Sequence, residues 1–186
     1  MPRISLTPPR TLLMRVLSWY SRRTYGKVLD PGLALGHNPR VLVSYLRLER
    51  RVAKWNRLDA DLGHLAVMAC AARINCSWCM DFGYWEGHER GLAPEKIKRV
   101  PRWREHREVF TGLELLVMEY AEAMTETEPA VTDELAAELV ARLGEEAFVE
   151  LTAVVSLENW RSRINSALGL TSQGFSEACQ VPGVRA

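Results

Sequence analysis

The sequence predicts an all-α fold in a single domain. Apolar residues recur every three or four positions along most of the chain, and the strict alternation expected of a strand is nowhere sustained. The hairpin dipeptides Asn-Gly and Asp-Gly are absent as well. A chain of 186 residues fits one domain, and a domain of that size can bury about 70% of the surface that its unfolded chain exposes.

The first part of the chain is expected to form three helices. Residues 10–23 have one apolar face, and residues 26–36 are expected to form a loop. The second helix begins with Asn38 as its N-cap and Pro39 at its first position, where the missing proline N–H costs nothing. Asp59 caps a third helix that is apolar nearly all round, which is typical of a helix buried in a core.

The later helices are delimited by residues that cap or interrupt helices. These expected boundaries are Gly91, Pro94, the capping box of Thr111 and Glu114, Thr132 or Asp133, Gly144 and Gly169. They predict a short helix after Pro94 and a long last helix over residues 145–167. Beyond Ser172 we expect a loosely packed tail.

Charge is distributed unevenly along the chain. Residues 1–57 carry twelve Lys or Arg and two acids, a net charge of +10, and the remaining residues carry −9. We interpret the basic part as a face exposed to solvent or lying between subunits. Binding to nucleic acid or to a membrane surface is the alternative, but no base-stacking motif accompanies the arginines, so we expect neither partner.

No apolar run reaches the 18 or more residues of a membrane span. The apolar segment near the N-terminus is interrupted by Arg15, which argues against a signal peptide. We therefore expect a cytoplasmic protein, in which thiols stay reduced and a Cys-x-x-Cys motif is more often catalytic or metal-binding than structural.

The stretch INCSWCMDFGYWEGHERG, residues 74–91, contains such a motif in Cys76 and Cys79. On a helix these residues are neighbours at i and i+3, with Cβ atoms about 5–6 Å apart, so a disulfide can close with little adjustment. With Asn75 as a cap, both thiols would lie in the first helical turn, where the helix dipole favours a thiolate. The spacing therefore suits reversible dithiol chemistry.

Two other interpretations of the motif remain open. A structural zinc site needs four ligands, but Cys70 and Cys179 are isolated and the four histidines of the chain form no closely spaced pair. Alternatively, Cys76 and Cys79 are packed and inert, since free cysteine is among the most buried residue types. Cys70, on the apolar helix, is interpreted as a core residue.

The segment LDADLGHLAVMACAARINCSWCMDFGYWEGHERGLAPEKI resembles the carboxymuconolactone decarboxylase/alkylhydroperoxidase D-like family. The later segment VELTAVVSLENWRSRINSALGL is similar to the last helix of that family. The resemblance implies an alkylhydroperoxidase D-like helical bundle over residues 39–172, preceded by a basic N-terminal arm (1–38) with one amphipathic helix and followed by a tail (173–186). It also implies a homo-oligomer, either a trimer or a hexamer.

The resemblance implies a thiol-dependent antioxidant peroxidase or thiol-disulfide oxidoreductase without a cofactor or metal. By this match Cys79 attacks a hydroperoxide or disulfide substrate, and Cys76 resolves the product as a disulfide. A partner protein with its own dithiol would then reduce that disulfide.

The proton relay of the family is not retained as such, because its three positions hold His64, Trp78 and Gly83. His64 is a candidate base, since an imidazole titrates near neutral pH, but only if the chain bends near Asn75. Glu86 and Asp81 are further candidates for a relay, although carboxylates close to a thiol raise its pKa. The simpler alternatives are a buried helix histidine for His64 and a surface acid for Glu86.

Two other functions are compatible with this fold class, because a fold alone does not select a chemistry. One is a non-catalytic oligomeric binding protein, and the other is an enzyme of the lactone decarboxylase type that does not use the cysteines.

Side chains near these motifs are interpreted as structural. They are the aromatic residues Trp78, Phe82, Tyr84 and Trp85, and the polar residues Glu158, Asn159, Arg161, Arg163 and Asn165 of the last helix.

Overall fold

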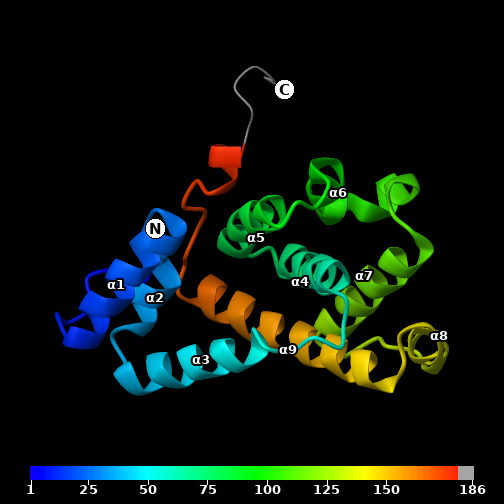
Figure 1. Ribbon diagram of the computed structural model, residues 1–186, viewed down its shortest axis with the longest axis horizontal. Coiled ribbons are helices and arrows are strands. Elements are labelled where there is room, and N and C mark those ends of the chain that lie inside the picture. The colour runs from blue at the N-terminus through cyan, green and yellow to red at the C-terminus, as the bar shows by residue number, and fades with distance from the viewer. Residues whose placement is uncertain (180–186) are drawn as a thin grey trace.

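The computed structural model describes residues 1–179, and every regular element within them is a helix (Figure 1). In chain order the elements are α1 (Leu12–Tyr25), α2 (Asp30–Leu35), α3 (Pro39–Val52), α4 (Ala60–Ile74), α5 (Ser77–Glu89), α6 (Pro94–Arg99), η1 (Val100–Val109), α7 (Gly112–Thr125), α8 (Asp133–Leu143), α9 (Glu145–Ala167) and η2 (Ser176–Cys179). The predicted all-α fold is confirmed.

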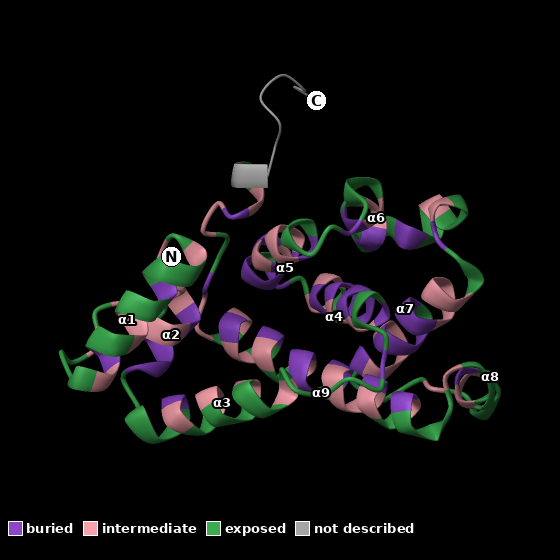
Figure 2. Cartoon of the chain, in the orientation of Figure 1, coloured by how far each residue is buried: buried purple, intermediate pink, exposed green. Residues whose placement is uncertain are grey.

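Helix α4 lies at the centre of the main core. It packs against α7, α9 and α5, and its residues Leu65, Met68, Ala69 and Cys70 are almost completely buried. Figure 2 shows α4 as a mainly buried helix between the other elements. The prediction from its all-round apolar sequence is therefore confirmed. Because α4 is fixed on several sides, the turn that follows it is placed on a rigid support.

The turn from α4 to α5 depends on Asn75. This residue has a φ of 61° in the left-handed region, and its backbone N–H bonds to the carbonyls of Ala71 and Ala72 at the end of α4. Asparagine is one of the few residues other than glycine that adopt this conformation readily. The structure corrects one expectation, because Asn75 ends α4 and the N-cap of α5 is Cys76.

Most of the predicted helix boundaries are confirmed. Thr111 and Glu114 form the complete capping box of α7, and Thr132 rather than Asp133 caps α8. Asn38 caps α3, and Asp59 caps α4. These caps satisfy N–H groups that the first turn of a helix leaves without a partner.

The N-terminal arm differs from the expectation of one helix followed by a loop. Residues 30–35 form α2, which has Pro31 in its first turn, so the arm contains two helices. The chain before α1 is also fixed, because the N–H of Arg3 donates to the carbonyl of Leu168 at 2.8 Å. This bond ties the start of the chain to the end of α9.

The expected loose tail is also corrected for the part that the structure describes. Phe175 is buried, and Gln173 and Ser176 are hydrogen-bonded to other elements. Figure 1 shows this segment passing between the α1–α2 region and α5. The rest of the predicted tail, residues 180–186, lies outside the described residues. Among residues 1–179, no helix is long and apolar enough to cross a membrane.

Candidate active site

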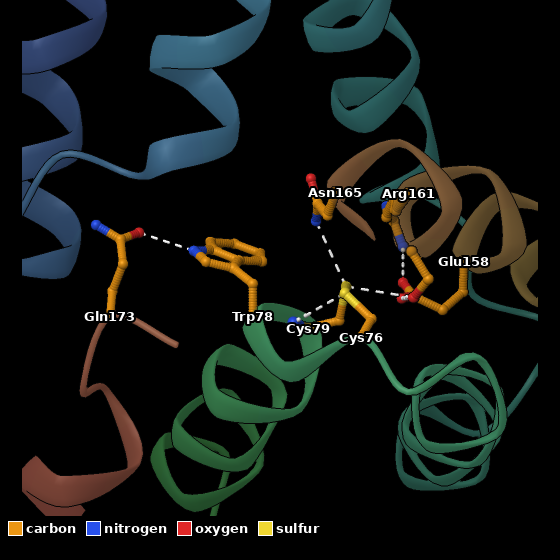
Figure 3. The surroundings of a disulfide bond; sticks show 8 residues. Cys76, Trp78, Cys79, Glu158, Arg161, Asn165 and Gln173 are labelled. Atoms are coloured by element: carbon orange, nitrogen blue, oxygen red, sulfur yellow. Dashed lines mark hydrogen bonds and ion pairs between the residues drawn. A yellow bond between two sulfur atoms is a disulfide. The ribbon is translucent and has the colours of Figure 1, made fainter. Parts of the chain in front are cut away.

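Cys76 and Cys79 stand at the start of α5 and are joined as a disulfide (Figure 3). Their Cα atoms are 5.3 Å apart, as one helical turn allows. The N–H of Cys79 donates to the Sγ atom of Cys76 at 3.2 Å. Cys76 is 1% exposed and Cys79 is 8% exposed, so Cys79 is the more accessible of two nearly buried residues.

Polar side chains of α9 surround the sulfur of Cys79. Ser162 Oγ lies 3.2 Å from Cys79 Sγ, and Asn165 Nδ2 donates to the same sulfur at 3.4 Å. Ser162 Oγ also lies 2.6 Å from Glu158 Oε1. Because Glu158, Ser162 and Asn165 follow at spacings of four and three residues, they share one face of the helix, and this face is turned towards Cys79.

Glu158 is a carboxyl group in an unusual environment. Its residue is only 3% exposed, and burial raises its pKa to about 7 although Arg161 acts in the opposite direction. Arg161 Nη1 lies 3.4 Å from Glu158 Oε2, but the same guanidinium also donates to both carboxylate oxygens of Glu49 on α3, at 2.7 and 2.5 Å. One cation is therefore shared between two acids.

Apolar residues from both ends of the chain cover the disulfide. The cluster around Cys76, Trp78 and Cys79 includes Ala71 on α4 and a set of residues from the arm and from the end of α9. These are Ile4, Leu6, Leu29, Ala34, Leu168 and Leu170. The cover accounts for the low exposure of the two cysteines.

Two aromatic side chains of α5, Trp78 and Phe82, belong to this cover, in agreement with their interpretation as structural residues. Trp78 stacks on Phe82, with ring centroids 5.1 Å apart, and Phe82 meets Phe175 edge-on. The indole N–H of Trp78 donates to the side-chain oxygen of Gln173 at 2.8 Å, as Figure 3 shows. The same oxygen accepts the N–H of Asp30. Gln173 therefore connects the arm, α5 and the C-terminal segment.

His64, the candidate base, is buried in α4. Its Nε2 atom lies 3.0 Å from the carbonyl oxygen of Gly83, and its Nδ1 atom lies 3.9 Å from Glu86. Burial lowers the pKa of the imidazole, although Glu86 acts in the opposite direction. Neither contact links the ring to Cys76 or Cys79. A role of His64 in proton transfer therefore stays a prediction.

The two candidate relay acids have different environments. The side chain of Glu86 is half-exposed, and it faces His64. Asp81 is buried and accepts the N–H groups of Gln173, Phe175 and Ser176. Burial alone would raise the pKa of Asp81, but these hydrogen bonds hold it below its usual value. The carboxylate of Asp81 fixes the C-terminal segment, and its role as a relay stays a prediction.

The sequence interpretation missed the role of α9 next to the cysteines. Glu158, Ser162 and Asn165 are all buried polar residues, and they were assigned to support of the fold or left out. A signal was present, since polar residues at i, i+4 and i+7 form one stripe on a helix that is otherwise anchored by apolar residues. What the stripe faces cannot be read from its spacing.

The remaining cysteine with a described side chain, Cys70, is a core residue as predicted. Burial raises the pKa of its thiol to about 12, and Thr125 and Asn159 donate to its sulfur. In the part of the chain that the structure describes, no three His, Cys, Asp or Glu side chains are grouped as a metal site would require. Among the described residues, the buried disulfide with polar side chains of α9 against the sulfur of Cys79 is therefore the best candidate for an active site.

Comparisons with known proteins relate the whole chain to other sequences and to solved structures. No model of a known protein family matches the chain. The uncharacterized protein YnjA of Escherichia coli K12 is 35% identical over 189 aligned positions, which cover 100% of this chain and 98% of YnjA. The likeness therefore extends over both proteins, the N-terminal arm included.

Solved structures share the fold at lower sequence identity. The debrominase Bmp8, solved in complex with 2,3,4-tribromopyrrole as a variant with one cysteine replaced by alanine, superposes with a TM-score of 0.80 at 16% identity, covering 94% of this chain and 95% of Bmp8. A protein of unknown function from Agrobacterium tumefaciens, described as a candidate AhpD antioxidant-defence protein, gives 0.69 at 23% identity, covering 74% of this chain and 94% of that protein. The chain thus belongs to the same family as YnjA, and its fold is that of the alkylhydroperoxidase D-like proteins.

Proposed function

We propose that the protein is a thiol-dependent peroxidase and disulfide oxidoreductase that cycles Cys76 and Cys79 between dithiol and disulfide. One observation carries the proposal: the two sulfurs are within bonding distance at the start of a helix, and each has a hydrogen-bond donor directed at it. Such donors stabilise a thiolate, which is the reactive form of cysteine. The peroxidase-like activity that the family resemblance implies is in keeping with this geometry.

Cys79 is the proposed nucleophile because it is the more exposed of the two cysteines and its sulfur contacts polar side chains of α9. Its thiolate attacks the distal oxygen of a hydroperoxide, the O–O bond breaks, and the alkoxide leaves as an alcohol after taking up a proton. Cys79 is oxidised to a sulfenic acid. The thiol of Cys76 then attacks that sulfur and displaces water, which completes the disulfide.

Re-reduction needs two electrons and two protons from an external dithiol. The thiolate of a reducing partner protein attacks Cys79, and Cys76 leaves as a thiolate that the N–H of Cys79 can stabilise. A second thiol of the partner then releases Cys79. Nothing in this cycle requires a metal or an organic cofactor. Assembly as a trimer or hexamer and a cytoplasmic location remain predictions.

The test is steady-state consumption of a hydroperoxide by the protein with a small-molecule dithiol as reductant. Wild-type protein is expected to turn over. Cys79→Ser should lose the activity by at least about a hundredfold, because the nucleophile is removed. When hydroperoxide is added without the dithiol, Cys76→Ser should keep Cys79 as a sulfenic acid that a sulfenic-acid reagent can trap, whereas wild type should form the disulfide.

Two results would exclude the proposal in favour of the other functions. Thiols that resist both hydroperoxide and alkylation in the folded protein would indicate a binding protein with an inert core pair. A lactone decarboxylase-type reaction that survives Cys79→Ser would indicate a chemistry that does not use the cysteines.

A further inference from the structure

We infer that Ser162 and Glu158 form the proton relay of Cys79. The Ser162 hydroxyl contacts the sulfur and is the catalytic hydroxyl, and Glu158 accepts the thiol proton by way of that hydroxyl. The inference rests on the proposed function in one respect only, the use of Cys79 as a nucleophile. It places the acceptor of the thiol proton on α9, whereas the sequence indicates His64 on α4 as the candidate base.

The first support is an unbroken line of polar atoms. Ser162 Oγ lies 3.2 Å from Cys79 Sγ and 2.6 Å from Glu158 Oε1, so the hydroxyl touches both groups. Ser162 is completely buried, which keeps bulk water from replacing it. A hydroxyl carries one hydrogen and two lone pairs, and it can therefore accept from a thiol while it donates to a carboxylate.

The second support is the charge balance around Glu158. From its own helix it faces Arg161, and that cation is paired with Glu49 on α3, so the ionised cluster has one negative charge in excess. Tyr45 on α3 faces the same cluster, and burial raises its pKa, so it stays neutral. A proton on Glu158 removes the excess charge in a place where an unpaired charge is costly.

Two thiols also face Glu158 from neighbouring helices. Cys70 faces it from α4, and burial raises the pKa of that thiol to about 12. Cys79 faces it from α5 through Ser162. Burial sets the pKa of Glu158 at about 7, where an acid–base group is most effective at neutral pH.

The proposed transfer balances without any outside acid or base. In the reduced protein the thiol of Cys79 donates its proton to Ser162 Oγ as Ser162 passes its own hydrogen to Glu158 Oε1. The products are a thiolate, which Asn165 Nδ2 stabilises, and a neutral carboxyl. When the hydroperoxide bond breaks, Glu158 returns its proton to Ser162 Oγ as the Ser162 hydroxyl gives its own hydrogen to the leaving alkoxide, and Glu158 is ionised again.

The test follows the alkylation rate of Cys79 by iodoacetamide as a function of pH, with mass spectrometry to locate the label. Reduced wild-type protein is compared with Glu158→Gln, Ser162→Ala and the double variant. At pH 7 each single variant is expected to react about tenfold or more slowly than wild type, because the buried thiol has lost the group that takes its proton as the sulfur attacks. At about pH 10 the rates should converge, because an ordinary thiol with a pKa near 8.5 is then ionised without help.

The double variant separates a relay from independent structural effects. If Ser162 and Glu158 act in series, the double variant should be no slower than the slower single variant. Glu158→Asp, which keeps the carboxyl group, should recover part of the rate. Matched controls on the same helix are Ser156→Ala and Glu146→Gln, whose side chains are exposed, and both should keep the wild-type profile.

A measurement on wild-type protein covers the case in which a variant does not fold. Infrared difference spectra between pH 5 and pH 9 should show one buried carboxyl losing its proton near pH 7, and its midpoint should move when Cys79 is oxidised to the disulfide. The relay is overturned if the carboxyl titrates only below pH 5. It is also overturned if the titration midpoint of the carboxyl is the same in the reduced and the oxidised protein.

The outcomes distinguish the relay from the proposed function. Wild-type and variant proteins that are alkylated at equal rates at pH 7 would overturn the relay, even if hydroperoxide still forms the disulfide. The same holds if His64→Gln shifts the profile and Glu158→Gln does not. A protein whose alkylation depends on Glu158 and Ser162 as expected, but which no hydroperoxide oxidises, would keep the relay and contradict the peroxidase.

Discussion

Asp81 shows how one carboxylate fixes a segment over the site. Its oxygens accept hydrogen bonds from three backbone N–H groups and from the Ser176 hydroxyl. Asp81→Asn should lower the free energy of unfolding by about 2–3 kcal/mol, as expected for losing bonds to a buried charge. Urea denaturation at pH 7 measures the loss. Since the pKa of Asp81 is lowered, its contribution is present above its unfolded value of 3.8 and disappears as the pH falls below it. An equal difference between wild type and variant at pH 7 and at pH 3 would contradict this assignment.

Glu158 should give the opposite dependence on pH. Its pKa rises from 4.5 in the unfolded chain to about 7 in the folded protein. Its protonated form is therefore favoured by folding, and this contribution is complete below pH 4.5 and is lost as the pH rises through 7. The stability of wild type relative to Glu158→Gln should fall by up to about 3 kcal/mol between pH 5 and pH 9. Chemical denaturation of the reduced proteins tests the trend, and a relative stability that rises with pH would refute it.

At the scale of helices, the turn at Asn75 determines where α5 and its cysteines begin. The left-handed conformation of this residue costs most side chains about 1–2 kcal/mol. Asn75→Val should lower the stability by at least that amount, whereas Asn75→Gly should stay within about 0.5 kcal/mol of wild type. Thermal unfolding of the two variants provides the comparison. Equal losses for Val and Gly would show that the side chain of Asn75, and not its backbone conformation, matters.

The sequence predicted those elements whose signals are local. The caps at Asn38, Asp59 and Thr111 lie next to the helices that they start, and the all-round apolar pattern of α4 reports its burial directly. The short helix α2 was missed because six residues give too little periodicity to recognise.

The candidate site divides in the same way. The disulfide pair was predictable because its two residues are three positions apart. The contact between Cys79 and Ser162 spans 83 positions and depends on how α5 crosses α9, which no local pattern encodes.

For the whole molecule, the position of the N-terminal arm has a consequence for access to the dithiol. Ile4 and Leu6 lie over the cysteine cluster. Ile4→Asp or Leu6→Asp should open this cover, because a carboxylate cannot remain in an apolar contact without a partner. We expect the alkylation rate of Cys79 to rise about tenfold or more. Leu12→Asp on α1 is the matched control, since this leucine is exposed and the rate should not change. If the Ile4 and Leu6 variants behave like the control, the arm does not limit access.

The most direct test of the central claim is a single-turnover experiment on reduced wild-type protein. One equivalent of hydroperoxide is added, the reaction is quenched with an alkylating reagent at increasing times, and peptide mass spectrometry quantifies the Cys76–Cys79 disulfide. The account predicts that the intramolecular disulfide forms within the first time points, with one alcohol released for each bond and Cys70 unchanged. If Cys76 and Cys79 are still free thiols at the last time point, the result contradicts the account.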